Sequence, residues 1–263
     1  MIENTLKTAW TADTPTIGLW ISSADPASLE PLGGVGYDYI CFDLQHGLID
    51  YSAVVPGLQA LNRSSCMPLA RVPWNEPGII GKVLDAGVMG VIIPMVNSPE
   101  EAQQAVAACR YAPLGARSWG PARAARSTGG DYHADANTHL ACIPMIETKE
   151  AVDNLEAILE VQGIDAVYVG PADLSISYGL PPATDHPDSA EYQEALAKIV
   201  DVSRSRGVVP GIHTVPGLVQ HRIDQGFRMV TATSNVLSQL AGAKNALAVA
   251  KGETTAEAGG SLY

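Results

Sequence analysis

Two carboxylates stand at corresponding positions after two consecutive apolar segments. Glu147 ends the stretch ACIPMIE, and Asp173 ends AVYVGPAD. Short apolar segments bounded by breakers are typical of strands in a parallel sheet covered on both faces, so an acid directly after one lies outside the core. Converging carboxylates repel each other unless a shared proton, a basic side chain or a hard divalent cation intervenes. The pair indicates either a metal site or two structural acids that cap the following helices.

Further chemically versatile side chains follow other apolar segments, namely Trp20, Asp43, Gln45, His46, Arg71 and His213. His46 alone would more often be structural, but Arg71 in such a position can stabilise an oxyanion while a histidine moves a proton. A cation on two carboxylates keeps open positions for a 2-oxo acid and acidifies the carbon beside the oxo group. Metal-assisted aldol chemistry is the reaction that this set favours.

The elements that must position these side chains alternate regularly between strand-like and helix-like segments. We count eight such units in 263 residues, the first of them with Asp25 as helix N-cap and Pro26 at the first helical position. This pattern predicts one closed (β/α)8 barrel, a TIM barrel, over residues 1–252, followed by a tail at 253–263. A doubly wound open sheet is the alternative, but no GxGxxG turn follows the first strand.

The segment between the two acids predicts how they meet. TKEAVDNLEAILEVQG has one apolar helical face and a stop at Gly163. Strand, helix and strand form a right-handed crossover, so the strands run parallel and both carboxylates emerge at the same edge. Earlier, Ser98, Pro99 and Glu101 predict a capping box. A polar stretch at 113–138 interrupts the alternation, and such long loops are often functional.

Composition excludes several partners. The net charge of −12 and the absence of a basic cluster argue against a nucleic acid or an anionic membrane. No apolar segment is long enough to cross a bilayer. The four cysteines have no metal or redox spacing, which predicts reduced core thiols and a cytoplasmic location; they are Cys41, Cys66, Cys109 and Cys142.

Three long stretches resemble the class II pyruvate aldolases of the HpcH/HpaI type: RVPWNEPGIIGKVLDAG, VIIPMVNSPEEAQQAV with RYAPLGARSWG, and IETKEAVDNLEAILEVQGIDAVYVGPADLS. The resemblance covers nearly the whole chain. It implies a (β/α)8 barrel that swaps its last helix with a neighbouring subunit in a homohexamer, a trimer of dimers. It also implies a divalent cofactor, Mg2+, Mn2+ or Co2+, and cleavage of a 4-hydroxy-2-oxo acid to pyruvate or hydroxypyruvate plus an aldehyde.

The same resemblance implies a role for individual residues. Glu147 and Asp173 correspond to metal ligands, His46 to the general base, Asp85 to the acid that raises its basicity, and Arg71 to the stabiliser of the transition state. The expected substrate-binding residues are Ala172, through its backbone amide, together with Gly170, Trp20, Met145 and His213.

The sequence departs from the family pattern at three places. Met145 stands where heptanedioate aldolases usually have a glutamine, His213 stands at an often apolar position and predicts a polar or hydroxylated aldehyde, and DLQHG replaces DGEH. An oxaloacetate decarboxylase, a citryl- or malyl-thioester lyase and a non-catalytic barrel that binds 2-oxo acids stay open as alternatives.

Overall fold

Eight parallel strands form one sheet in the order β5-β4-β3-β2-β1-β8-β7-β6 in the computed structural model, which describes residues 3–253. Their bounds are β1 Thr16–Ile21, β2 Tyr39–Asp43, β3 Met67–Arg71, β4 Gly90–Ile93, β5 Ala141–Pro144, β6 Ala166–Val169, β7 Val209–His213 and β8 Met229–Ser234. The two edge strands meet through an isolated parallel bridge between Met145 and Tyr168. The predicted (β/α)8 barrel is therefore confirmed, and the open sheet is wrong.

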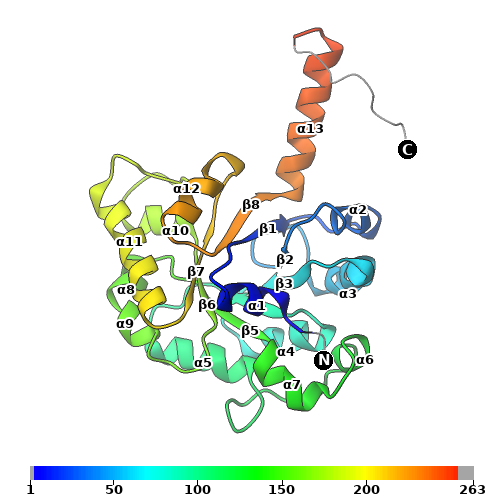
Figure 1. Ribbon diagram of the computed structural model, residues 1–263, viewed down its shortest axis with the longest axis vertical. Coiled ribbons are helices and arrows are strands. Elements are labelled where there is room, and N and C mark those ends of the chain that lie inside the picture. Colours follow the sequence, from blue (N-terminus) through cyan, green and yellow to red (C-terminus); the bar gives the residue numbers. More distant parts are fainter. Residues whose placement is uncertain (1–2, 254–263) are drawn as a thin grey trace.

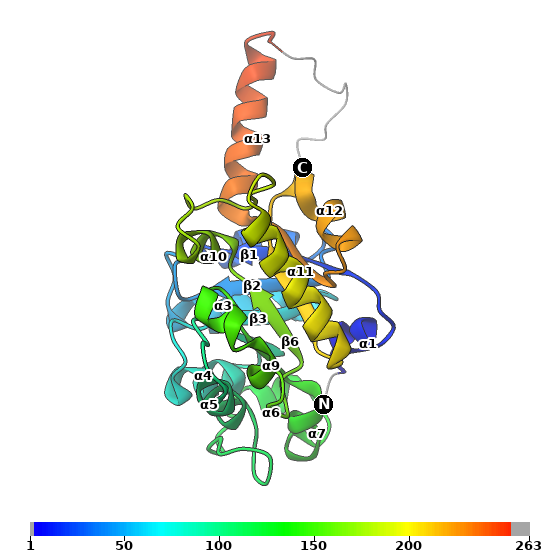
Figure 2. The same ribbon diagram turned by 90° about the vertical axis from the view of Figure 1, so that its left-hand side faces the viewer.

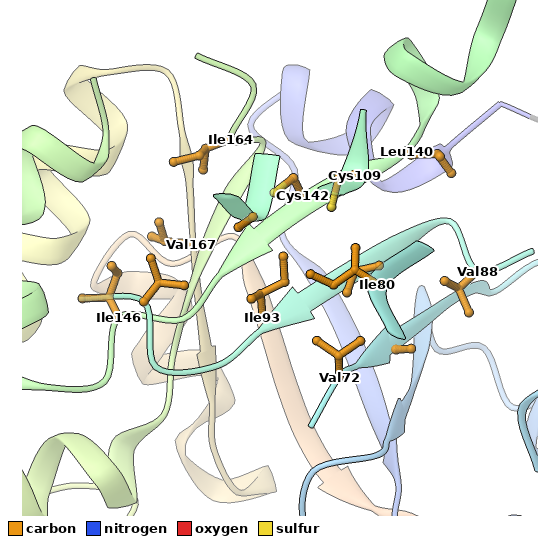
Figure 3. Close-up of a cluster of buried hydrophobic side chains, with 14 of the residues drawn as sticks. Val72, Ile80, Val88, Ile93, Cys109, Leu140, Cys142, Ile146, Ile164 and Val167 are labelled. Carbon is orange, nitrogen blue, oxygen red and sulfur yellow. The ribbon is translucent and has the colours of Figure 1, made fainter. Parts of the chain in front are cut away.

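Every strand is buried on both faces, as the uninterrupted apolar segments predicted. Alternate residues point into the barrel, where Trp20, Tyr39 and Tyr168 belong to one cluster. Gly18 is required there because a Cβ at this position would overlap the Tyr39 ring. The other residues pack against the helices in a second, larger cluster, part of which is drawn in Figure 3.

Helices surround the barrel (Figure 1). Their bounds are α1 Thr5–Thr11, α2 Pro26–Leu32, α3 Tyr51–Ala60, α4 Pro77–Ala86, α5 Pro99–Cys109, α6 Ala124–Ser127, α7 Tyr132–His139, α8 Lys149–Asp153, α9 Leu155–Ile158, α10 Pro171–Ser177, α11 Ala190–Ser205, α12 Val219–Asp224 and α13 Asn235–Ala250, with 3-10 turns at Leu61–Arg63 and Pro216–Leu218. The caps predicted at Asp25 and Ser98 are confirmed, since each side chain accepts a hydrogen bond from a first-turn amide.

Two local features differ from the sequence prediction. The single helix expected after β5 is broken at Asn154, whose side chain donates to the Asn97 carbonyl. The apolar face expected for this helix is nevertheless buried in both halves. A further helix, α1, precedes the first unit. Its Leu6 and Trp10 join the cluster inside the barrel, so α1 closes the N-terminal end of the barrel.

The joint between β5 and β6 depends on side chains. The Asp165 carboxylate accepts from the Cys142 backbone amide at 2.8 Å, and it also pairs with Arg110 at 2.6 Å and Lys7 at 2.7 Å. At the start of β5, the Asp165 carboxylate thus accepts the hydrogen bond that a backbone carbonyl of the neighbouring strand would accept in a regular parallel sheet.

The last helix, α13, projects away from the barrel (Figures 1 and 2). No residue of α13 is buried within one chain, and Val236, Leu237, Leu240 and Leu247 are all more than 40% exposed.

The tail predicted at 253–263 lies outside the described residues from position 254 onward. All four cysteines are buried and free, as predicted. None of the helices at 3–253 has the length and apolar character needed to cross a bilayer.

Candidate active site

The buried carboxylate of Glu147 occupies the C-terminal end of the barrel, which we call the mouth. The residue is 2% exposed; its Oε1 accepts a hydrogen bond from the Met95 backbone amide at 2.8 Å, while its Oε2 is buried without a partner. Met95 has a φ of 56°, a conformation that costs a residue with a side chain about 1–3 kcal/mol. The fold thus holds one oxygen of the acid in place and leaves the other available.

The charge on Glu147 is costly in this environment. Burial raises the pKa of its carboxyl to about 7, and the negative charge of Asp173 adds to the increase, while the Met95 amide and Arg71 oppose it. Asp173 lies in the first turn of α10 with an exposed side chain. A buried acid with one unpartnered oxygen, coupled to a second acid, has the donor chemistry that a hard divalent cation requires.

Gly170 provides the space for this acid. A Cβ at Gly170 would clash with Oε2 of Glu147 and would lie 3.0 Å from Cε of Met145. Met145 itself is 1% exposed and belongs to the barrel interior, so its side chain lies beneath the mouth. Ala172 is exposed in the first turn of α10, where backbone amides have no partner within the helix.

Asp43 and Arg71 form a bidentate ion pair across β2 and β3, which the register places side by side. Nε donates to Oδ1 at 2.8 Å and Nη2 donates to Oδ2 at 2.7 Å. Burial alone would raise the pKa of Asp43, but the guanidinium lowers it below its usual value. The arginine is held rigidly, and it retains further N–H donors for an anionic ligand.

Trp20 and His213 form a wall of the mouth that includes the end of β1, across the barrel from β5 and Glu147. The Trp20 ring lies 5.2 Å from the Arg71 guanidinium, stacks on Tyr168 at 5.5 Å, and meets His213 edge-on at 5.2 Å. Trp20 is 3% exposed, whereas the His213 side chain is partly exposed. Both predicted substrate-binding side chains therefore belong to one aromatic wall that reaches Arg71.

His46 and Asp85 are not brought together within one chain. His46 is exposed in the loop after β2, and its backbone amide donates to Asp43. Asp85 is near the end of α4, whose start follows β3, so it lies toward the opposite end of the barrel. There its carboxylate pairs with Arg117 at 2.6 Å. The contact expected between Asp85 and His46 does not form inside a single copy.

Several contributors to the site had no predicted role. Asp43 was recognised only as a polar strand end, and its pairing with Arg71 depends on a strand register that the sequence does not reveal. Met95 follows the fourth apolar segment, so the position after that strand was the available signal. Tyr168, which stacks on Trp20, and Thr231, which accepts a hydrogen bond from the Tyr168 hydroxyl, lie inside apolar strands and carried no signal of function.

The carboxylates of Glu147 and Asp173 are the candidate metal ligands, because the buried Oε2 of Glu147 has no partner and the two acids influence each other electrostatically. In the described part of the chain, no group of three or more His, Cys, Asp or Glu side chains is placed to hold a metal ion. The fold and this mouth define a class, the TIM-barrel enzymes whose site lies at the C-terminal ends of the strands. The chain belongs to the HpcH/HpaI aldolase/citrate lyase family, whose model matches residues 16–240.

Individual relatives agree with this membership. A hydroxypyruvate/pyruvate aldolase from Rhizorhabdus wittichii is 35% identical over 249 residues, which cover 94% of this chain and 99% of that protein. A 4-hydroxy-2-oxo-heptane-1,7-dioate aldolase from Salmonella dublin is 40% identical over 214 residues, 80% of each chain. A crystal structure of an HpcH/HpaI aldolase/citrate lyase family protein from Burkholderia cenocepacia is 30% identical and superimposes with a TM-score of 0.87, covering 94% of this chain and 99% of that one.

Proposed function

We propose that this protein is a divalent-metal-dependent aldolase that reversibly cleaves a 4-hydroxy-2-oxo acid to pyruvate or hydroxypyruvate plus an aldehyde. The names of the two sequence relatives support the reaction class. The observation that carries the proposal is the buried, unpartnered Oε2 of Glu147 at a mouth that also presents Asp173 and Arg71. A sensor of 2-oxo acids would not need a general base, so the exposed His46 favours catalysis over binding alone.

Glu147 and Asp173 would hold the cation, which we expect to be Mg2+, Mn2+ or Co2+. Once bound, it supplies a Lewis acid that makes the carbon beside the 2-oxo group more acidic. Glu147 contributes a preformed oxygen, because the amide of Met95 fixes its other oxygen. Ala172 would offer its backbone N–H to the substrate carboxylate, and the lack of a side chain at Gly170 keeps the approach open.

Arg71 and His46 divide the remaining chemistry. The guanidinium, fixed by Asp43, would stabilise the negative charge that develops on the 2-oxo oxygen, and a preorganised donor needs no rearrangement at that moment. His46 takes the proton from the 4-hydroxyl as the carbon-carbon bond breaks. In the reverse direction it returns that proton to the new alkoxide.

Asp85 can raise the basicity of His46 only if a second copy of the chain supplies it. Its ion pair with Arg117 lies on the outer surface of α4, beside a cavity of about 640 Å³. The active site would then be completed at a contact between subunits. Mixing His46→Ala and Asp85→Ala proteins, each inactive alone, would restore activity in mixed assemblies; no recovery after confirmed subunit exchange would refute the shared site.

Assembly also accounts for α13. Its apolar residues need a partner surface, and we propose that the helix packs on a neighbouring barrel in a homohexamer. Leu240→Glu with Leu247→Glu would dissociate the assembly in sedimentation experiments. Asn245→Glu, on the opposite face of the same exposed helix, is the matched control and would leave the assembly intact.

The direct test is pyruvate release from a panel of 4-hydroxy-2-oxo acids by chelator-treated protein, with and without Mn2+ or Mg2+. Metal-dependent release that disappears in Glu147→Ala supports the proposal. Metal-independent release would remove the two carboxylates from the mechanism. No release from any compound, together with CO2 production from oxaloacetate, would replace the aldolase by a decarboxylase.

A further inference from the structure

A chain of hydroxyl groups runs through the barrel to the mouth. The Tyr39 hydroxyl lies 2.9 Å from Oγ1 of Thr231, the Tyr168 hydroxyl donates to the same Oγ1 at 2.5 Å, and the Tyr168 oxygen lies 3.5 Å from Nδ1 of His213. Both tyrosines and the threonine are completely buried. The polar groups of this buried chain face one another, and only its histidine end reaches solvent.

The direction of the Tyr168–Thr231 hydrogen bond favours one tautomer of His213. Because the Tyr168 proton is directed to Thr231, the Tyr168 oxygen is left to accept from Nδ1 of His213. A neutral imidazole that carries its proton on Nδ1 has a lone pair on Nε2. No hydrogen bond to Nε2 of His213 occurs among residues 3–253.

The imidazole is also held neutral. Packing within the aromatic wall lowers the pKa of His213 to about 4, and the positive charge of Arg71 acts in the same direction, while Asp43 opposes it. Near neutral pH the ring therefore has no positive charge to attract a carboxylate. Its exposed edge offers one hydrogen-bond acceptor beside the Trp20 ring.

We propose that His213 determines substrate specificity by accepting, through Nε2, a hydrogen bond from a substrate hydroxyl, and that Tyr168 and Thr231 position it for this role. The inference rests on the proposed aldolase function and deepens it, because it predicts a hydroxylated substrate. A site built to pair a hydroxyl discriminates against an analogue without it, since an acceptor that the bound substrate removes from water is then left unpaired. The relevant hydroxyl belongs either to the aldehyde or to hydroxypyruvate.

Four aldol additions distinguish the two sources. Pyruvate and hydroxypyruvate are each combined with propanal and with glycolaldehyde, and kcat/KM is measured with Mg2+. A preference for glycolaldehyde that depends on His213 with either donor assigns the hydroxyl to the aldehyde. A preference for hydroxypyruvate that depends on His213 with either aldehyde assigns it to the donor.

The decisive variants are His213→Leu and His213→Gln. One neutral hydrogen bond corresponds to about threefold to tenfold in kcat/KM. His213→Leu should remove that much preference, measured as the ratio of kcat/KM with the hydroxylated compound to kcat/KM with the analogue that lacks the hydroxyl. His213→Gln retains an acceptor and should keep part of the preference. Thr231→Val removes the acceptor of the Tyr168 proton, so Nδ1 of His213 is no longer held as the donor. This variant should reduce the preference for the hydroxylated compound, with a larger change in KM than in kcat.

A measurement independent of turnover completes the test. In 15N-histidine-labelled protein with Mg2+, the His213 signal is identified by its loss in His213→Leu. Nε2 should be the unprotonated nitrogen, and its resonance should move when glycolaldehyde or hydroxypyruvate is added but not with propanal and pyruvate. A protonated Nε2, or an equal loss of all four rates in His213→Leu, would overturn the inference. Absence of any aldol addition by the wild type would instead refute the proposed function.

Discussion

Glu147 should make the metal-free protein less stable as the pH rises from 4.5 to 7. Burial raises the pKa of this carboxyl to about 7 in the fold, against an ordinary value of 4.5. Between those values the folded chain holds a proton that the unfolded chain has lost, so the free energy of unfolding falls with increasing pH. The stabilisation is complete below pH 4.5 and is lost once the pH passes 7.

The size of the effect follows from the same values. One pH unit over this interval is worth about 1.4 kcal/mol, and the whole interval therefore about 3 kcal/mol. The carboxyl is only 2% exposed, so solvent screens this cost weakly. The net charge of −12 gives a pH dependence of the same sign, because self-repulsion grows as acids ionise. A matched variant is therefore needed to isolate the single group.

Urea denaturation of chelator-treated protein, at one fixed protein concentration, measures this dependence. Glu147→Gln keeps the shape of the side chain and cannot ionise, so its stability should fall by about 3 kcal/mol less than that of the wild type over the same pH range. Adding Mn2+ at pH 8 to a hundredfold excess over its Kd should restore about 2.7 kcal/mol to the wild type. Glu147→Gln should gain little from the metal.

Parallel stability curves for the two proteins would show that burial does not raise the Glu147 pKa in this way. A shift in the curve with no recovery on adding Mn2+, Mg2+ or Co2+ would retain the electrostatic account but remove the metal-ligand role. The two results therefore contradict different steps of the reasoning.

Three further predictions concern the geometry of the mouth and the fold. Arg71→Lys cannot form the bidentate pair with Asp43, and the rate of pyruvate release should fall about 100-fold or more. Gly170→Ala places a Cβ against the buried carboxylate oxygen and should weaken metal binding, measured by calorimetry, about 10- to 100-fold. Gly217→Ala, whose Cβ would meet nothing within 4 Å, should bind normally. Arg222→Ala removes a completely buried partner of an ion pair and should cost about 3–5 kcal/mol in urea denaturation; a loss under 1 kcal/mol would contradict this.

The barrel was predictable because its signals are local and repeat. Apolar segments, the caps at Asp25 and Ser98, and glycines such as Gly163 each identify an element without reference to distant residues. The helix α1 gave no such signal, since its Leu6 and Trp10 become core only against the closed barrel. The break at Asn154 likewise depends on a contact with Asn97, 57 residues away.

For the site, the sequence predicted which residues follow the strands but not which of their side chains contact one another. That Glu147 and Asp173 influence each other follows from their position after consecutive strands. The pairing of Arg71 with Asp43 depends on register, and the unpartnered oxygen of Glu147 depends on the backbone of Met95. The separation of Asp85 from His46 could not be read from motifs, because a motif does not specify how far apart two residues lie in the fold.

The joint where the barrel closes lies between the two candidate metal ligands. β5 and β6 share a single bridge, Met145–Tyr168, and the contact between Asp165 and the Cys142 amide, whereas neighbouring strands elsewhere share ladders of three or more pairs. Glu147 follows one of these strands and Asp173 follows the other. A ligand that binds both acids would therefore link β5 and β6 a second time, and amide hydrogen exchange along these two strands should slow when the mouth is occupied. In this barrel, ligand binding at the mouth and stabilisation of the joint between β5 and β6 would therefore occur together.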